Sequence, residues 1–102
     1  MGNRRTDPWS KDLLAFDAST PGWPDFMRVF PILDWEYADV WTFLCQLKLP
    51  YCSLYDAGFT SLGEKNNSAP NPNLKRTDES GKVTFLPAFE LKDGNLERDS
   101  RV

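Results

Sequence analysis

The sequence predicts a small domain of the α/β class, and three observations support this prediction. Apolar residues recur at helical spacing in one stretch, residues 34–50. Two short apolar runs next to prolines, residues 26–33 and 82–86, are typical of strands. The length of 102 residues allows one hydrophobic core and not two independent ones.

The first quarter of the chain is predicted to be a long loop. Proline, glycine and tryptophan are frequent up to Asp25, and only Lys11–Phe16 is a candidate for a short helical turn. So long a connection is uncommon in a compact domain unless it has a function. The following run, Phe26–Leu33, is expected to be a strand at a sheet edge or an irregular segment, because Pro31 has no backbone N–H to donate.

The strongest predicted element is a helix that begins after Asp34 and ends before Pro50. Asp34 can cap its first turn, and Pro50 cannot continue it. Its apolar positions lie three and four residues apart, on one helical face: Tyr37, Val40, Trp41, Leu44 and Leu47. Because an amphipathic surface helix buries its apolar face, we interpret Tyr37 and Trp41 as core residues.

The second half of the chain is predicted to consist mostly of loops around one short strand. Residues 51–63 mix glycines and hydroxyl residues with aromatic ones, which is typical of ordinary turns and can also bring backbone amides near an anion. Residues 64–76 are expected to be a polar loop, Asp78–Gly81 a turn and Lys82–Leu86 a strand. The charged tail, residues 90–102, would by itself be a solvated C-terminus.

The composition excludes several functions. With 12 Lys and Arg against 15 Asp and Glu, the net charge of −3 argues against nucleic-acid binding. Histidine is absent, which excludes histidine-based catalysis and histidine metal sites. No apolar run approaches the roughly 20 residues of a membrane span. Cys45 and Cys52 are too few for a thiolate zinc site, and we expect them to be reduced and partly buried in a cytoplasmic protein.

Several motifs occur along the chain in a characteristic order. They are Asn3–Pro8, Trp23–Val29, Pro31–Trp35, Asp39–Trp41, Leu49–Asp56, Gly58–Gly63, Pro70–Pro72, Leu86–Leu91 and Leu96–Arg101. Together they resemble the eukaryotic FAD synthase (FMN adenylyltransferase) family over nearly the whole chain. Residues 34–63 also resemble phosphoadenylylsulfate reductases, but the cysteine motif with which those enzymes end is missing after Gly63. The resemblance implies a Rossmann-like, adenine-nucleotide-binding layered fold with long loops.

The resemblance also implies an activity. FMN and ATP would be the substrates, FAD and pyrophosphate the products, and Mg²⁺ the cofactor that accompanies ATP. The glycine-rich, lysine-containing phosphate loop of the family is not found in this sequence. We therefore expect residues 1–102 to be the C-terminal part of a single catalytic domain, inactive alone, with the N-terminal half or a second copy as its partner. The alternatives are a reductase relative and a non-catalytic remnant that binds a flavin or a partner protein.

Two arginine pairs receive roles from the resemblance. Arg98 and Arg101 match the C-terminal tail of the family and are expected to be catalytic residues that contact phosphate. Of Arg4 and Arg5, one is expected to bind a substrate phosphate. The other would form a structural ion pair, with Asp7 as a candidate partner.

The remaining candidates are expected to bind the substrates. Asp7, beside Thr6, is a candidate acceptor for the flavin ring or ribityl chain, and a simple turn at Thr6–Pro8 is the alternative. Trp9 and Phe59 are candidates to pack against a flavin or adenine ring, whereas core packing is favoured for Tyr55. The candidates to line the nucleotide phosphates are Gly58, Thr60, Ser61 and Gly63. The sequence identifies no ligand for Mg²⁺.

Overall fold

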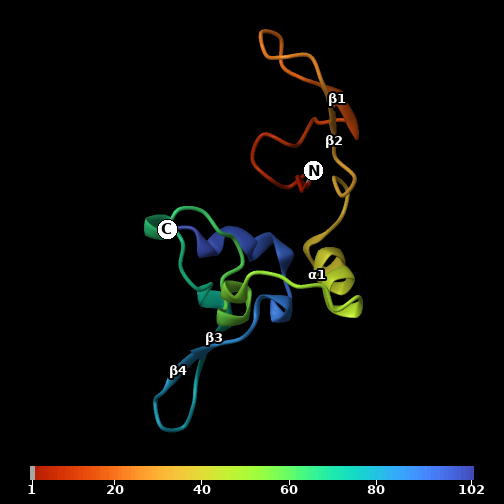
Figure 1. The fold of residues 1–102 in the computed structure, drawn as a ribbon. Helices are drawn as coiled ribbons and strands as arrows, with labels where there is room; N and C mark the ends of the chain where they lie inside the picture. The colour runs from red at the N-terminus through yellow and green to blue at the C-terminus, as the bar shows by residue number, and fades with distance from the viewer. Residues whose placement is uncertain (1) are drawn as a thin grey trace. The chain divides into compact units, whose positions relative to one another are not determined.

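The computed structural model describes residues 2–102 and divides the chain into two compact units (Figure 1). One unit comprises the residues up to Glu36, and the other comprises Tyr37–Val102. The described residues contain one α-helix, two antiparallel two-stranded sheets and several short 3₁₀ helices. This confirms the predicted α/β class, with shorter strands than expected.

The sheet of the first unit is a small hairpin. Its strands are β1 (Phe16–Ala18) and β2 (Met27–Val29), paired in the register Phe16↔Val29, Asp17↔Arg28 and Ala18↔Met27. The predicted strand over 26–33 is therefore confirmed only for its first half. Residues 31–34 form turns instead, because proline fixes φ and favours a turn position. The predicted helical turn at residues 11–16 is wrong, since this segment consists of turns that lead into β1.

Burial in the first unit is limited to a few side chains. Phe30 and Leu33 are buried, together with the polar residues Arg4 and Ser10. The backbone N–H of Arg5 donates to the Leu33 carbonyl at 2.7 Å and so joins the N-terminal segment to this small core. Most other apolar side chains of the unit are exposed, as expected for a segment rich in loops.

The predicted helix is confirmed as α1 (Tyr37–Gln46), with Tyr37 and Trp41 buried. Its start is later than expected. Asp34 lies three residues before the helix and accepts the Nε–H of Arg5 at 2.7 Å, so it does not occupy the N-cap position. The apolar face is also shorter than predicted, because Leu47 is beyond the helix and exposed.

The end of α1 is set by backbone geometry before Pro50 is reached. Lys48 has a φ of 52°, in the left-handed region. The N–H of Lys48 donates to the Cys45 carbonyl at 3.2 Å, and that of Leu49 to the Leu44 carbonyl at 3.0 Å. These two bonds form a Schellman motif, in which glycine is the usual left-handed residue.

The core of the second unit is built around Trp41. Its buried members are Tyr37, Trp41, Leu74, Ala88 and Leu91. The indole ring of Trp41 makes edge-on contacts with Tyr51 and Tyr55, at centroid distances of 5.0 and 5.4 Å. The Tyr37 hydroxyl donates to the Ala88 carbonyl at 2.7 Å. Tyr55 is thus part of the core surroundings, as the sequence favoured, and its burial raises its pKa.

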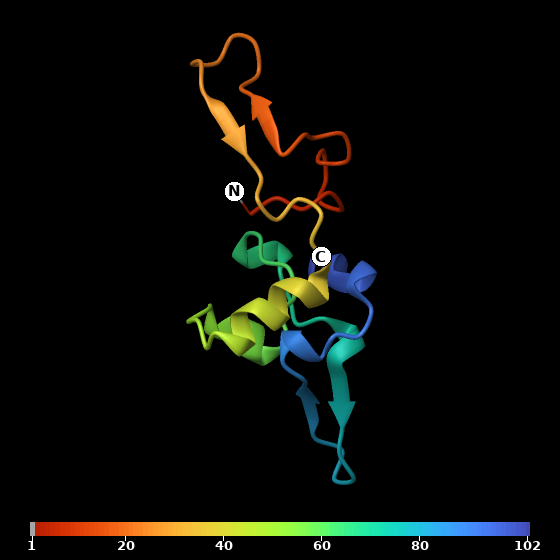
Figure 2. The same ribbon diagram turned by 90° about the vertical axis from the view of Figure 1, so that its right-hand side faces the viewer.

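A second hairpin, β3 (Lys75–Thr77) with β4 (Val83–Phe85), projects away from α1 in both views (Figures 1 and 2). The predicted turn is confirmed. The Asp78 carboxylate accepts from the Ser80 hydroxyl and from backbone N–H groups of Ser80 and Lys82, and these bonds lower its pKa. β4 confirms the predicted strand, whereas β3 falls in the expected polar loop.

Five 3₁₀ helices supply the other ordered segments of residues 37–102. They are η1 (Ser53–Ala57), η2 (Lys65–Asn67), η3 (Pro72–Leu74), η4 (Ala88–Glu90) and η5 (Gly94–Ser100). Asn71 and Asp93 accept backbone N–H groups at the starts of η3 and η5. The C-terminal tail is therefore folded, and it is not the solvated end that its charge pattern alone suggested.

Two further expectations can be compared with the described residues. Cys45 and Cys52 are free thiols but exposed, so the expectation of partial burial is wrong. None of the helices found in residues 2–102 has the length and apolar character needed to cross a membrane.

Candidate functional site

The arginine pair of the first unit is bound within its own unit. The Arg5 guanidinium pairs with Asp34 at 2.7 Å and donates from Nη1 to the Lys11 and Leu13 carbonyls at 2.9 and 3.0 Å. Arg4 is buried, with Nη1 donating to the Trp35 carbonyl at 3.3 Å. Arg5 therefore forms the structural ion pair that was expected of one arginine, with Asp34 as its partner and not the suggested Asp7.

The Arg4–Ser10 segment folds into two consecutive turns. The Arg4 N–H donates to Asp7 Oδ2 at 2.9 Å, the Asp7 N–H to the Arg4 carbonyl at 2.9 Å, and the Ser10 N–H to the Asp7 carbonyl at 3.1 Å. Asp7 is half-buried and organises the first turn, whereas Thr6 is exposed. The turn role that the sequence offered for Thr6–Pro8 is thus present in the structure.

Trp9 differs from the other residues of these turns in its backbone conformation and its exposure. Its φ is 66°, a left-handed value that is rare for a bulky residue, and its side chain is 98% exposed. A large ring held in solvent on a strained backbone gains nothing from burial. Such strain is found most often at functional positions.

The loop of residues 58–63 is anchored at its glycine ends. Gly58 has a φ of 94°, and a Cβ there would lie 2.6 Å from the Phe85 Cβ, so only glycine fits. At the other end, a Cβ on Gly63 would lie 2.5 Å from Arg101 Nη1 and from Asn67 Oδ1. The Gly63 N–H donates to Ser68 Oγ at 2.8 Å.

The hydroxyls of this loop are buried and bonded to the protein. Thr60 Oγ1 donates to the Glu97 carbonyl at 2.5 Å, and Ser61 Oγ accepts from Arg101 Nε at 2.8 Å. Phe59 between Gly58 and Thr60 is half-buried. Within residues 2–102, the backbone N–H groups of Ser61 and Leu62 have no acceptor, so these amides are the donors that the loop leaves available.

The tail folds back onto the same loop. Arg101 donates from Nε to Ser61 Oγ and from Nη2 to the Leu62 carbonyl. Ser100 is fully buried, and its backbone carbonyl accepts from the Ala69 N–H at 2.9 Å. The loop 58–63 and the tail 96–101 thus form one hydrogen-bonded assembly, which we call the loop–tail assembly.

The two tail arginines differ within this assembly. Arg101 is half-buried and bound to the loop through two of its three guanidinium nitrogens. Arg98 is exposed, and its side chain makes no hydrogen bond or ion pair with the described part of the chain. A planar, permanently charged guanidinium without a protein partner is suited to bind a phosphate from solution.

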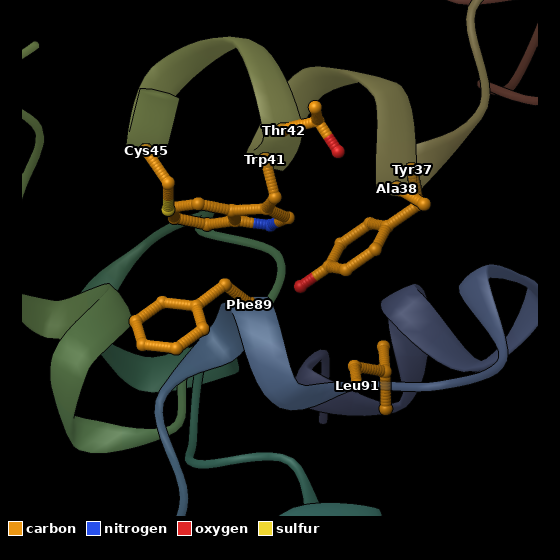
Figure 3. A pocket seen from close by; sticks show the side chains of 7 residues that line it. All are labelled: Tyr37, Ala38, Trp41, Thr42, Cys45, Phe89 and Leu91. Atoms are coloured by element: carbon orange, nitrogen blue, oxygen red, sulfur yellow. The ribbon is translucent and has the colours of Figure 1, made fainter. Parts of the chain in front are cut away.

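A separate pocket of about 230 Å³ lies beside α1 and opens to solvent (Figure 3). Its lining consists of Tyr37, Ala38, Trp41, Thr42, Cys45, Phe89 and Leu91. Figure 3 shows the Cys45 side chain next to the indole ring of Trp41, with Phe89 and Leu91 facing the helix. The pocket contains none of the site residues predicted from the sequence. Two of its lining residues, Tyr37 and Trp41, were predicted only as core residues.

No magnesium site can be assigned to the residues present. Within residues 2–102, no three acidic or thiol side chains come together in a group that would hold a metal ion. Carboxylates and carbonyl oxygens are the protein ligands that Mg²⁺ uses. Because Mg²⁺ bound together with a nucleotide commonly uses only one or two carboxylates, no individual ligand is assigned here.

Comparison with known families identifies the chain. Residues 1–70 match the family model of the phosphoadenosine phosphosulfate reductase domain, and the chain belongs to this family. Reductases themselves are more distant relatives: the enzyme of Xylella fastidiosa is 31% identical over 52 residues, half of this chain.

Within the family, the chain is most informatively compared with FAD synthases. The probable FAD synthase of Schizosaccharomyces pombe is 48% identical over 101 residues, which is 99% of this chain and 37% of that protein. The flavin adenine dinucleotide synthase of Saccharomyces cerevisiae is 40% identical over 106 residues, which is 100% of this chain and 34% of that protein. The chain thus spans little more than a third of the length of these relatives, and the resemblance seen in the motifs is confirmed.

The fold agrees with these relatives. The crystal structure of Candida glabrata FMN adenylyltransferase superposes with a TM-score of 0.88 at 29% identity, over 100% of this chain and 48% of that one. A structure of the same enzyme in complex with FAD and inorganic pyrophosphate gives 0.87. The predicted fold family is therefore confirmed, with about half of the solved chain represented here.

Proposed function

We propose that this chain is part of an FMN adenylyltransferase, which makes FAD from FMN and ATP. The observation that carries the proposal is the extent of the similarity. The reductase family model ends at residue 70, whereas the FAD synthase relatives match 99–100% of the chain. The shared part therefore includes the folded tail with Arg98 and Arg101.

The proposed reaction needs no protein nucleophile. An oxygen of the FMN phosphate attacks the α-phosphorus of ATP, and a new P–O bond forms while the bond from the α-phosphorus to the bridging oxygen breaks. Pyrophosphate leaves with that oxygen. The protein has to hold two anions in line and neutralise the charge that develops between them, which arginines and backbone amides do well.

The two tail arginines receive different roles in this proposal. Arg98 contacts a substrate phosphate directly, because its guanidinium has no bond to the rest of residues 2–102 and is exposed. Arg101 holds the loop through Ser61 and Leu62 and offers its remaining nitrogen, Nη1, beside Gly63. Only an uncovered guanidinium nitrogen can bind an anion without first losing a protein bond.

The loop is proposed to bind phosphate through its backbone. The hydroxyls of Thr60 and Ser61 are bonded to Glu97 and Arg101, so they shape the loop, and the amides of Ser61 and Leu62 are its donors. Gly58 and Gly63 allow the close packing that this shape requires. Consecutive free amides form the kind of concavity that binds anions.

The turns of the first unit are proposed to recognise the flavin. Trp9 is the stacking candidate because its ring is almost entirely exposed, whereas Phe59 is half-buried. Asp7 and Thr6 are the polar contacts that we propose for the flavin ring or ribityl chain. Arg5 is the structural member of the arginine pair, since it is paired with Asp34. For Arg4, which is buried and donates to the Trp35 carbonyl, contact with a substrate phosphate stays a prediction from the family resemblance.

The proposal also concerns the whole protein. We infer that residues 1–102 form the C-terminal part of one catalytic domain, and that the phosphate loop for ATP belongs to the part of the relatives that this chain does not span. Mg²⁺ would accompany ATP, whose phosphates supply oxygen ligands that this ion prefers. The N-terminal half, or a second copy, would complete the protein. We place the protein in the cytoplasm, because free thiols such as Cys45 and Cys52 persist there.

The test is to incubate the full-length protein with FMN, ATP and Mg²⁺ and to measure FAD by chromatography and pyrophosphate by a coupled assay. Equal amounts of both products support the proposal. Sulfite released from phosphoadenylylsulfate and a thiol donor, without FAD, would show a reductase instead. FMN binding without either product would show a non-catalytic flavin-binding protein.

The same assay with residues 1–102 alone examines the partial-domain proposal. We expect no FAD from this piece. FAD at the rate of the full-length protein would show that all catalytic residues lie within it, and the proposal of a missing phosphate loop would be wrong.

A further inference from the structure

The side chain of Asn71 uses all of its hydrogen-bonding groups within the second unit. It is fully buried, with 0% of its surface exposed. We propose that Asn71 is a positioning residue, which fixes the arginine-bearing tail against loop 58–63. The proposal rests on the adenylyltransferase function proposed above.

The side-chain amide of Asn71 is bonded through both its nitrogen and its oxygen. Nδ2 donates to Thr60 Oγ1 at 2.9 Å and to the Leu96 carbonyl at 2.8 Å. Oδ1 accepts from the backbone N–H and the side-chain Nδ2 of Asn73, at 2.9 and 2.8 Å. A side chain with two donors and two acceptor sites in this small space is satisfied only as asparagine.

Asn71 is connected to the tail both directly and through Thr60. The side chain of Asn71 touches the tail directly at Leu96 and indirectly through Thr60, whose hydroxyl donates to the Glu97 carbonyl at 2.5 Å. The Thr60 N–H donates to Ser100 Oγ at 3.3 Å, and Ser100 Oγ donates to the Ala69 carbonyl. The tail is thus held at Leu96, Glu97 and Ser100, on both sides of Arg98.

Asn71 is also bonded to the loop through its backbone. The backbone N–H of Asn71 donates to the Gly58 carbonyl at 2.8 Å, so the residue that holds the tail also holds the first residue of the loop. Asn73, which bonds to Asn71, donates in turn to Asp99 Oδ2 at 2.8 Å. Asn71 therefore bonds to the first residue of the loop through its backbone and to the tail through its side chain.

The consequence for Arg98 follows from its lack of other anchors. Because its guanidinium bonds to nothing else in residues 2–102, its place depends on the backbone of η5 alone. A displacement of about 1 Å at a positioning group can lower a reaction rate about 100-fold. Asn71 touches neither arginine side chain, so it acts on them only through this backbone.

The experiment compares Asn71→Asp with Asn66→Asp in the full-length protein. The aspartate keeps the shape and the acceptors of Asn71 and removes both Nδ2 donors. Asn66 is exposed and undergoes the same chemical change, so it serves as the control. We expect kcat for FAD synthesis to fall about 10–100-fold in Asn71→Asp. We expect KM for FMN and ATP to stay within about threefold, with kcat unchanged in the control.

A double variant separates positioning from general destabilisation. If Asn71 acts through the tail, Asn71→Asp combined with Arg98→Ala will have the kcat of Arg98→Ala, within about threefold. Multiplied losses in the double variant would overturn the proposal. A loss explained by the unfolded fraction, measured by thermal unfolding at the assay temperature, would also overturn it.

Ser100→Ala provides an independent variant in case Asn71→Asp does not fold. It removes one buried hydroxyl that bonds to Thr60 and Ala69, and we expect the same selective loss of kcat. Unchanged kcat in Ser100→Ala would overturn the proposal. The two hypotheses fail differently, because an unmodified protein that makes no FAD contradicts the proposed function, whereas an active protein insensitive to these changes contradicts only the positioning role.

Discussion

The two regions that carry the arginine pairs are built by different means. The turns of residues 4–10 are closed by bonds between neighbours in the sequence, such as those of Arg4 with Asp7, and are attached to residues 33–35 through Arg4 and Arg5. The loop–tail assembly is held by buried and partly buried bonds between residues 25 to 40 positions apart, such as Asn71 with Leu96 and Thr60 with Ser100. Local turns can form early and independently, whereas the assembly requires the folded second unit.

This difference also separates the arginines by role. In the first region Arg5 is bonded to Asp34, and in the second Arg101 is bonded to the loop. A guanidinium that already has protein partners contributes to structure, whereas an exposed one without partners is available for a ligand. The partners of an arginine therefore tell more about its function than its presence in a motif does.

The largest expected effect is on activity and concerns Arg98→Ala. Loss of one charge-assisted phosphate contact should lower kcat/KM for FAD synthesis by about 10–100-fold, or about 1.5–3 kcal/mol. The melting temperature should not change, because the side chain bonds to no other described residue. Arg76→Ala, at an exposed arginine of β3, is the matched control. Equal activity of the two variants would remove Arg98 from the site.

The next largest effect is a loss of stability in Gly58→Ala, which tests whether the packing of Gly58 against Phe85 is important for the loop. Gly58→Ala places a Cβ 2.6 Å from Phe85 at a φ of 94° and should destabilise the protein by about 2–3 kcal/mol. Gly81→Ala has a similar φ of 85° with open space around it, and should cost about 1 kcal/mol. Denaturant unfolding measures both. Equal losses would show that the contact with Phe85 is unimportant.

A smaller effect is expected for Trp9→Ala in the first region. Because the ring is 98% exposed, its loss should leave stability unchanged. If it stacks on the flavin, KM for FMN should rise about 3–10-fold, corresponding to about 0.5–1.5 kcal/mol. Trp23→Ala, at another exposed tryptophan, should leave KM unchanged. Steady-state kinetics with varied FMN decide between binding and no role.

Trp9 and Lys48 are the non-glycine residues of the described range, 2–102, that have a left-handed φ, and Lys48→Gly tests the one at the end of α1. The left-handed φ of Lys48 is explained by the end of α1, so glycine should stabilise the protein by about 0.5–1 kcal/mol without a change in activity. Thermal unfolding measures this gain. A destabilised Lys48→Gly protein would mean that the lysine side chain stabilises the helix end by more than the backbone strain costs.

The smallest effect is a pH dependence at Tyr51. Its hydroxyl donates to Asp56 Oδ1 at 2.6 Å, and this bond raises its pKa from 10.0 to about 12. The protonated hydroxyl is favoured in the folded state, so its stabilisation is complete below pH 10 and is lost as the pH rises toward 12. Tyr51→Phe should flatten the stability profile in this window, as measured by unfolding at several pH values. An unchanged profile would exclude the Tyr51 contribution.

The helix, its core residues and the second hairpin turn could be predicted because their signals are local. The spacing of Tyr37 and Trp41 and the Asp78–Gly81 turn each depend on a few adjacent residues. β3 could not be predicted, because Lys75, Arg76 and Thr77 are all exposed and lack the apolar alternation of a half-buried strand. Its pairing with β4 alone makes it a strand.

The candidate site was only partly accessible from the sequence for a similar reason. The resemblance placed Arg98 and Arg101 together, but only the folded chain separates the exposed Arg98 from the bonded Arg101. Asn71 lies in one of the motifs, yet its adjacent prolines made it look like an ordinary loop residue. Its role depends on Thr60 and Leu96, which are far away in the sequence.

The close approach of Gly63 and Arg101 constrains how this chain can diverge. A Cβ at position 63 would lie 2.5 Å from Arg101 Nη1 and from Asn67 Oδ1, so the ends of both side chains would have to move. Relatives in which the tail arginine keeps its present position against the loop are therefore expected to keep glycine at position 63.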